Sequence, residues 1–214
     1  MQNKNQVIAR EGYPFIALFA FITLVFALLG WAILTLLLLF LTLFSAYFFR
    51  NPERVVPVGD DLVVAPADGK VIFVGEVQED RYFKDQVTKV SIFMSVFNVH
   101  VNRVPCDGKV VEMYYNKGGF VNASYDKASE SNEQSGILLE TENDSRILFV
   151  QIAGLIARRI VTYPVIGDVL QKGARYGLIR FGSRVDIFFP KNADVTATLG
   201  EQTIAGETVL GTLS

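Results

Sequence analysis

The residues with the clearest chemical potential are a serine that follows a glycine and the single histidine of the chain. Ser183 follows Gly182 in the pentapeptide RFGSR at residues 180–184. A serine hydroxyl can attack the carbonyl carbon of the residue before it, and glycine has no Cβ to obstruct that approach. The same pair is also typical of a turn, because glycine tolerates a positive φ and serine bonds to nearby backbone. The dipeptide therefore has two interpretations, a bond that the protein cleaves in itself or a turn.

His100 is the only histidine of the chain. Period-two alternation places Asn98, His100 and Asn102 on one face of a predicted strand. Imidazole exchanges protons near neutral pH, which makes His100 the first candidate for a base. Asp68, in the turn-like segment APADG at 65–69, can orient such a ring, so Asp68, His100 and Ser183 form a candidate activating relay. The competing interpretation is a turn aspartate and a histidine on an exposed strand.

Several other chemistries lack the residues they require. One histidine and one cysteine without clustered carboxylates do not supply a zinc site, so we expect no metal. The net charge of −2 and the absence of a basic block give no indication of a nucleic-acid partner. Cys106 is the only cysteine, so no intrachain disulfide can form.

A long uncharged segment near the N-terminus predicts membrane helices. Residues 12–49 contain no charged side chain, and as one helix they would extend about 57 Å, whereas the hydrocarbon core is about 30 Å thick. Two spans, at about 13–29 and 32–49, with a reversal at Gly30-Trp31, fit that thickness better. We therefore expect a membrane hairpin over residues 1–50. The alternatives are a single tilted span and a cleaved signal peptide.

The charges beside the hairpin predict its orientation. Lys4 and Arg10 precede it and Arg50 and Arg54 follow it, so the positive-inside rule places both ends in the cytoplasm. The sequence thus predicts a protein of the cell membrane, with its remaining domain on the cytoplasmic side.

Residues 51–214 are expected to form one β-rich domain with minor helix, because short runs rich in β-branched and aromatic residues alternate with turn residues. The predicted strands are 62–65, 70–77, 87–97, 99–104, 109–115, 137–140, 146–152, 177–181 and 185–189. A loop with a short helix is expected at 122–133, and 155–162 is ambiguous. The DGKV turns at 68–71 and 107–110 resemble the interlocked hairpins of biotinyl and lipoyl carrier folds. That similarity concerns shape and carries no function.

Five segments in order make the chain similar to the phosphatidylserine decarboxylases, specifically the short form with an FGSR processing site. They are FFRNP at 48–52, APADG at 65–69, NVHVNRVP at 98–105, Asn132-Glu133 after KAS at 127–129, and FGSR at 181–184. The chain departs from the better-known bacterial pattern in two places. FGSR stands where LGST is common, and Arg103 stands where that form has a second histidine.

The resemblance implies a self-processing proenzyme. Ser183 would attack the Gly182 carbonyl, giving a β chain of residues 1–182 and an α chain of residues 183–214 whose first residue becomes a covalent pyruvoyl group. That cofactor would form a Schiff base with the amine of phosphatidylserine, and loss of CO2 would give phosphatidylethanolamine. The implied partners are the phospholipid substrate, the membrane and the protein's own two chains as a heterodimer, with the number of heterodimers in an assembly left open.

The resemblance also suggests roles for four further residues. His100 is the candidate for proton transfers and Asp68 for orienting it, while Arg103 or Arg184 can meet the headgroup phosphate or carboxylate or be structural. Two other functions stay open on sequence grounds. A membrane-tethered serine hydrolase would use Asp68, His100 and Ser183 but lacks a GxSxG elbow, and a noncatalytic membrane adaptor would have a biotinyl-like domain but lacks the carrier lysine.

Overall fold

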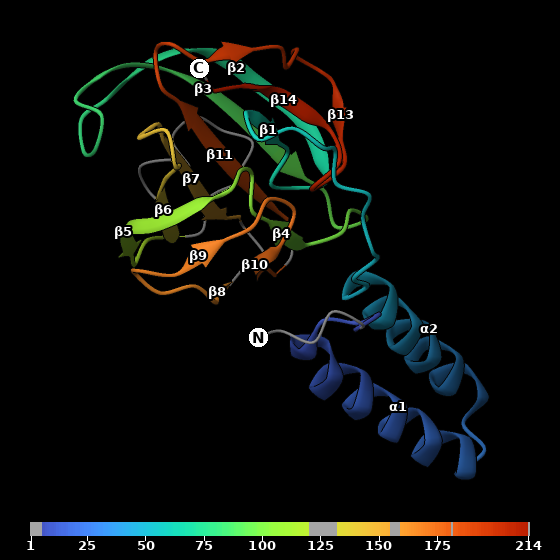
Figure 1. The fold of residues 1–214 in the computed structure, drawn as a ribbon. Helices are drawn as coiled ribbons and strands as arrows, with labels where there is room; N and C mark the ends of the chain where they lie inside the picture. Colours follow the sequence, from blue (N-terminus) through green and yellow to red (C-terminus); the bar gives the residue numbers. More distant parts are fainter. Residues whose placement is uncertain (1–5, 120–131, 155–158, 181, 214) are drawn as a thin grey trace. The chain divides into compact units, whose positions relative to one another are not determined.

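The computed structural model describes residues 6–119, 132–154, 159–180 and 182–213 (Figure 1). The chain divides into two compact units, Met1–Glu53 and Arg54–Ser214. Outside the described residues lie 122–131 of the loop with a short helix predicted at 122–133, which include the KAS segment at 127–129, and 155–158 of the ambiguous segment 155–162.

The first unit contains two apolar helices joined by a tight turn. A short 3-10 helix, Arg10–Gly12, leads into α1, Tyr13–Leu28, and α2 follows at Ala32–Phe48. Gly30 has a φ of +75° in the turn between them, a conformation that favours glycine. The hydroxyls of Thr23 and Thr42 lie 3.3 Å apart and join the two helices.

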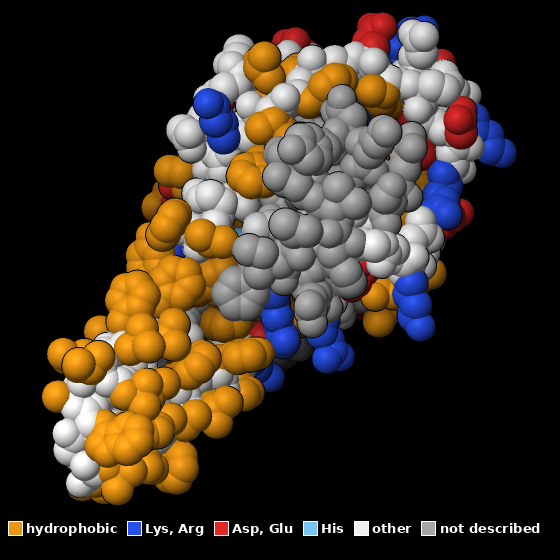
Figure 2. All heavy atoms as spheres, turned by 180° about the vertical axis from the view of Figure 1, so that it is seen from behind, with side chains coloured by type: hydrophobic (Ala, Val, Ile, Leu, Met, Phe, Trp, Pro, Cys, Tyr) orange, Lys and Arg blue, Asp and Glu red, His pale blue; other side chains and the backbone are white. Residues whose placement is uncertain are grey.

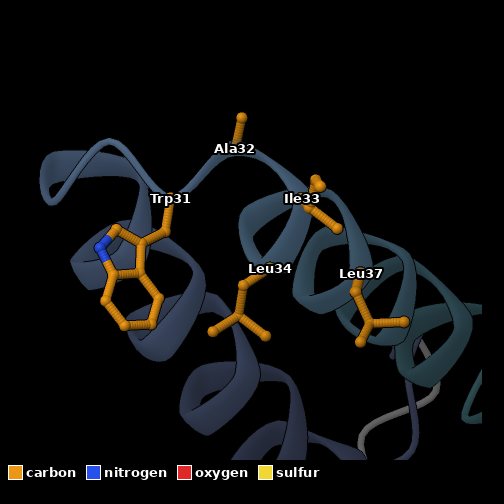
Figure 3. A pocket seen from close by; sticks show the side chains of 5 residues that line it. All are labelled: Trp31, Ala32, Ile33, Leu34 and Leu37. Carbon is orange, nitrogen blue, oxygen red and sulfur yellow. The ribbon is translucent and has the colours of Figure 1, made fainter.

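Most apolar side chains of these helices are exposed or half-buried, with Phe48 of α2 an exception. No residue of α1 is buried, and hydrophobic side chains cover most of the visible face of this unit in Figure 2. The turn end has an apolar hollow lined by Trp31, Ala32, Ile33, Leu34 and Leu37 (Figure 3). Arg10–Leu28 is the one helix in the described part of the chain that is long and apolar enough to cross a membrane, by length and composition alone, and Ala32–Phe48 is apolar but shorter.

The second unit is built from β-strands, which confirms the predicted mainly β fold class. The strands are β1 Leu62–Val64, β2 Gly69–Glu79, β3 Asp85–Met94, β4 Val101–Arg103, β5 Gly108–Asn116, β6 Gln134–Glu140, β7 Arg146–Ala153, β8 Ile160–Thr162, β9 Val169–Leu170, β10 Arg175–Ile179, β11 Ser183–Phe189, β12 Asp194–Val195, β13 Gln202–Thr203 and β14 Val209–Thr212. The largest sheet has the order β13-β2-β3-β11-β7-β6-β5-β9, and two three-stranded sheets have the orders β1-β14-β12 and β4-β10-β8.

Strand β11 lies in the middle of the largest sheet, antiparallel to β3 on one side and β7 on the other (Figure 1). Its odd-numbered residues Val185, Ile187 and Phe189 belong to the main hydrophobic core. Because alternate residues of a strand share a face, Ser183 faces the same core, and Arg184 and Asp186 face the other side of the sheet.

The predicted strand at 87–97 extends too far. β3 ends at Met94, because the Asn98 side-chain oxygen accepts hydrogen bonds from both the backbone nitrogen and the hydroxyl of Ser95, at 2.8 Å each. This local turn replaces the strand ladder. β4 begins only at Val101 and ends at Arg103, so neither Asn98 nor His100 lies in a strand with Asn102, which corrects the predicted alternation and the predicted strand at 99–104.

Candidate active site

Ser183 is the first residue of β11 and is completely buried. It stands opposite Met94 of β3 and Ala153 of β7. Its hydroxyl donates to the Met94 thioether, with 3.3 Å between Oγ and Sδ. Sulfur is a weak acceptor, so this contact orients the hydroxyl while leaving the oxygen lone pairs available for attack.

Gly182 supplies the backbone conformation that precedes the strand. Its φ is +58°, in the left-handed region that side chains with a Cβ rarely adopt. Among the described residues, a Cβ built on Gly182 would have no atom within 4 Å apart from its chain neighbours. Glycine is thus required here for its φ and not for close packing with the described residues.

His100 is nearly buried, at 2% exposure. Its Nδ1 lies 3.0 Å from the Asn98 carbonyl oxygen. A carbonyl oxygen only accepts, so in the neutral ring Nδ1 carries the proton and Nε2 holds the basic lone pair. The His100 carbonyl accepts from the Ile179 nitrogen at 3.3 Å, which joins the backbone of the candidate base to the end of β10, the strand that leads into the Gly182-Ser183 bond.

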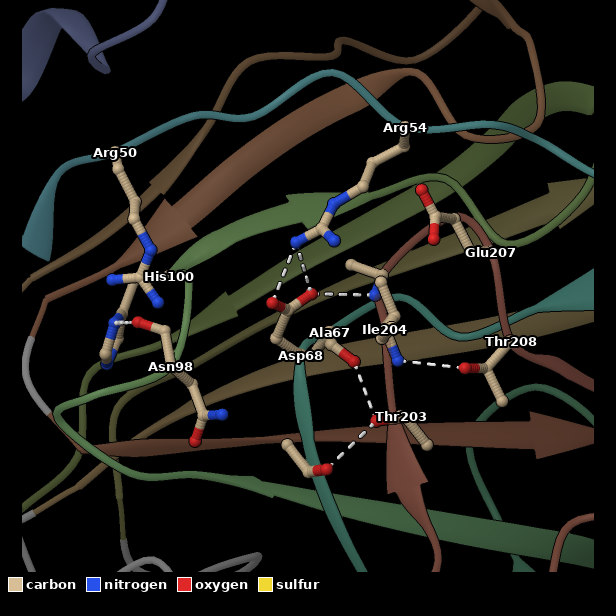
Figure 4. Close-up of polar contacts among 12 residues, drawn as sticks. Arg50, Arg54, Ala67, Asp68, Asn98, His100, Thr203, Ile204, Glu207 and Thr208 are labelled. Atoms are coloured by element: carbon tan, nitrogen blue, oxygen red, sulfur yellow. Dashed lines mark hydrogen bonds and ion pairs between the residues drawn. The ribbon is translucent and has the colours of Figure 1, made fainter. Parts of the chain in front are cut away.

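Asp68 has a different set of partners from those of the predicted relay. Its carboxylate binds Arg54 through both oxygens, at 3.0 and 2.8 Å, and accepts from the Ala205 nitrogen at 2.8 Å (Figure 4). A direct contact between Asp68 and His100 is not among the hydrogen bonds of the residues that the structure describes. The role of Asp68 as an orienting group for His100 therefore stays a prediction.

Comparisons with known proteins assign the family. The family model described as phosphatidylserine decarboxylase matches residues 41–211. A phosphatidylserine decarboxylase proenzyme of Syntrophotalea carbinolica is 68% identical over 213 residues, and those of Geotalea uraniireducens and Geobacter sulfurreducens are 53% and 52% identical, each alignment covering 100% of both chains. The chain belongs to the phosphatidylserine decarboxylase family. It is an enzyme of the lyase class, and the noncatalytic adaptor is excluded.

The two arginines proposed for headgroup binding both have partners within this decarboxylase. Arg103 donates from Nη1 to the Gly173 carbonyl at 2.8 Å. Arg184 forms a two-point pair with Asp186, with Nε–Oδ1 at 2.8 Å and Nη2–Oδ2 at 3.0 Å, and both side chains are almost fully buried. These contacts fit structural roles, and substrate binding by either arginine stays a prediction.

Sequence reasoning missed several polar residues that are linked to Ser183 through Asn102 and Met94 in this decarboxylase. Gln151, Thr162 and Ser135 form a hydrogen-bonded chain that ends at Asn102. One signal was present in the sequence, because Gln151 interrupts the apolar run ILFVQIA at 147–153. A buried glutamine in such a strand needs hydrogen-bond partners, although the sequence does not say which ones.

The remaining candidate chemistries find no support in the described residues. No group of three histidine, cysteine, aspartate or glutamate side chains is placed to hold a metal ion among them. Cys106 is buried in the core, and burial raises the pKa of its thiol to about 12. A protonated thiol is a poor nucleophile, which leaves Ser183 as the candidate nucleophile of this decarboxylase.

Proposed function

We propose that this chain is a self-cleaving proenzyme that converts Ser183 into a pyruvoyl group and uses it to decarboxylate phosphatidylserine to phosphatidylethanolamine. The observation that carries the proposal is the local structure of the Gly182-Ser183 bond. A buried serine with only a weak acceptor follows a glycine with a left-handed φ, at the start of the central strand of the sheet.

The first step of maturation needs only groups of this chain. Ser183 Oγ attacks the Gly182 carbonyl carbon, the peptide C–N bond breaks, and an ester forms while the Ser183 nitrogen takes up a proton. A base then removes the Ser183 α-proton, and breakage of the Cβ–Oγ bond releases Gly182 as a carboxylate. The dehydroalanine left at position 183 tautomerises and reacts with water, releasing ammonia and leaving the pyruvoyl group on residues 183–214.

The sheet pairing supports a stable pair of chains after this cleavage. β11 of the small chain is hydrogen-bonded between β3 and β7 of the large chain. β13 pairs with β2, and β14 pairs with β1, so three separate strands of the small chain continue sheets of the large one. Cleavage at 182/183 would therefore break one bond without releasing residues 183–214.

The residues present fit a pyruvoyl group at position 183. The site is buried, and its neighbours Met94 and Ala153 are apolar and belong to the main core, so a ketone there is protected from water. A pyruvoyl group at position 183 would supply a ketone able to condense with the substrate amine and to accept the electron pair left when CO2 departs. His100 Nε2 is the proposed site of proton transfer, since its Nδ1 is held at the Asn98 carbonyl.

The apolar N-terminal helices support a membrane location, because a lipid headgroup stays at the interface and an anchored enzyme gains effective concentration there. The evidence is one helix of sufficient length and apolarity, Arg10–Leu28, and the shorter apolar α2. The catalytic domain is proposed to be on the cytoplasmic side of the cell membrane, on the charge distribution of the sequence.

Intact-mass analysis of the purified full chain tests the proposal. We expect two chains that separate between Gly182 and Ser183, with a small chain whose mass increases on treatment with borohydride because its ketone is reduced. Ser183→Ala should remain one chain without decarboxylase activity, while Ser183→Thr keeps a hydroxyl as a matched comparison. An uncut wild-type chain that decarboxylates phosphatidylserine would overturn the proposal and favour a different use of Ser183.

A further inference from the structure

A row of neutral polar side chains, buried except for the half-buried Thr162, is linked to Ser183 through Met94. Ser135 and Thr162 have their hydroxyl oxygens 2.8 Å apart, Thr162 donates to Gln151 Oε1 at 2.9 Å, and Gln151 Nε2 donates to Asn102 Oδ1 at 2.8 Å. Asn102 and Gln151 are both completely buried. Unpaired polar groups at such depth are costly, so the row specifies one arrangement of the core.

Gly177, which has no side chain, leaves space for this row of polar side chains. Gly177 of β10 stands opposite Asn102 of β4 and Thr162 of β8. A Cβ at Gly177 would meet the Val161 carbonyl and lie 3.1 Å from Gln151 Nε2. Gln151 comes from the largest sheet, and its carboxamide bonds to residues on both sides of Gly177.

Gln151 also lies on the same face as Ser183. It stands opposite Val185 in the β7–β11 register, and Ala153 stands opposite Ser183. Residues two apart on a strand share a face, so the polar row and the serine belong to one side of the sheet.

The direction of the hydrogen bonds determines how Asn102 is oriented. The Thr162 hydroxyl donates to Gln151 Oε1, so Gln151 presents its amide nitrogen to Asn102 Oδ1. Asn102 Nδ2 is then directed at the Met94 thioether, 3.6 Å away, and the Pro66 carbonyl, 3.5 Å away. The same Met94 sulfur accepts from Ser183 Oγ at 3.3 Å.

We propose that Asn102 is a positioning residue for cleavage of the Gly182-Ser183 bond and acts through Met94. This inference rests on the proposed self-cleavage. Methionine has three rotatable bonds, and the Asn102 amide, itself fixed by Gln151, holds the sulfur in one place. The sulfur in turn holds the Ser183 hydroxyl hydrogen and leaves the oxygen lone pairs directed away from it, as attack on the Gly182 carbonyl requires.

The test is the cleavage rate of newly synthesised full chain in detergent, followed by intact mass. Asn102→Leu keeps the approximate volume and removes the amide, and we expect cleavage to slow by about 10- to 100-fold, since small misplacements of a reacting group have effects of that size. Met94→Leu, a volume-conserving change, should also slow cleavage. The double variant should be no slower than Asn102→Leu alone, because both changes interrupt the same path.

Ser135→Ala is the matched control, because it shortens the row at its far end and leaves the Asn102–Gln151 bond in place. Thermal midpoints of all variants are measured in the uncut Ser183→Ala background. Ser135→Ala should cleave within about twofold of wild type. The inference would be overturned if Asn102→Leu cleaved at the wild-type rate, or if the rate losses of the two single variants multiplied in the double variant. Cleavage rates that follow the thermal midpoints across all variants would also overturn it. A wild-type chain that never cleaves would instead overturn the proposed function.

Discussion

The polar groups around Ser183 and those around Asp68 differ in charge and in burial. The partners leading to Ser183 are a thioether and two carboxamides, those of Met94, Asn102 and Gln151, and all three residues are completely buried. Asp68 is ionically paired with Arg54, and their side chains keep 13% and 12% of their exposure. Burying a charge costs far more than burying a neutral amide unless the charge is paired. Arg184 and Asp186, which follow Ser183 in β11, are buried charges, but they pair with each other on the opposite face of the sheet from Ser183.

This difference separates two tasks within one domain. The neutral row ends at the bond proposed for cleavage, whereas Asp68 binds the Ala205 nitrogen of residues 183–214, the proposed small chain. Thr203, also within residues 183–214, likewise donates to the Ala67 carbonyl at 2.9 Å (Figure 4). We infer that changes near Ser183 affect reaction rates and that changes at Asp68 affect how firmly residues 183–214 are held.

The largest effect is expected from His100→Asn. Asparagine can still donate to the Asn98 carbonyl, as His100 Nδ1 does, but it has no group equivalent to the basic Nε2. We expect cleavage and decarboxylation each to slow by about 10²- to 10⁴-fold, the usual contribution of a general acid–base group. Cleavage is measured by intact mass, and turnover by release of labelled CO2 from phosphatidylserine vesicles.

His100→Gln provides the comparison for this prediction, because its carboxamide reaches toward the Nε2 position and cannot take up a proton. Both variants should be slow if proton transfer is the role of His100. Wild-type cleavage and decarboxylation rates in His100→Asn would show that another group is the base. The region around Ser183 would then not differ from that around Asp68 in its effect on reaction rates.

A moderate effect is expected from Asp68→Asn. The change removes the charge that binds Arg54 at two points and weakens the acceptor for Ala205. We expect the free energy of unfolding of the uncut Ser183→Ala chain to fall by about 1–3 kcal/mol. The cleavage rate of the corresponding chain with Ser183 should change by less than about threefold, an estimate that follows from separate, non-coupled sites. Chemical denaturation and intact mass measure the two quantities.

Arg54→Gln is the matched variant, and the double variant should be little less stable than either single one because the same pair is lost. If Asp68→Asn stopped cleavage while Arg54→Gln did not, Asp68 would act on His100 as the relay predicts. The division between the two regions would then be wrong.

The strands were largely predictable, because the alternation of apolar and polar residues that indicates a strand lies within one short segment of sequence. β2, β5 and β7 follow the predicted segments closely. The turn after Met94 was not predictable from hydrophobic alternation, since it depends on the Asn98 side chain bonding to Ser95. Likewise β8 is only three residues long, and it is defined by its pairing with β10.

The candidate site was predictable only in part. Gly182, Ser183 and His100 stood out by type and context, whereas the partners of Asp68 and Asn102 come from distant parts of the chain. Arg54 was interpreted as a charge that orients the membrane hairpin, yet in the fold it pairs with Asp68. The bond between Asn102 and Gln151 depends on the packing of two sheets, and no local pattern encodes that packing.

The smallest effect is expected from ionising the Cys106 thiol, which tests whether the core that contains Met94 can hold a charge. Cys106 belongs to the same core cluster, and burial, with a smaller contribution from Asp107, raises the pKa of its thiol from 9.0 to about 12. Burial also raises the pKa of Tyr176. Because the folded chain holds the thiol proton more tightly than the unfolded chain, this contribution to stability is complete below about pH 9 and is lost as the pH rises toward 12.

We therefore expect iodoacetamide to label Cys106 slowly at pH 8 in the folded chain and rapidly in urea. Stability should also fall less steeply above pH 9 in Cys106→Val than in wild type. Equal labelling of folded and unfolded chains would mean that this core admits water and charge, and the neutral surroundings of Ser183 would then not differ from those of Asp68.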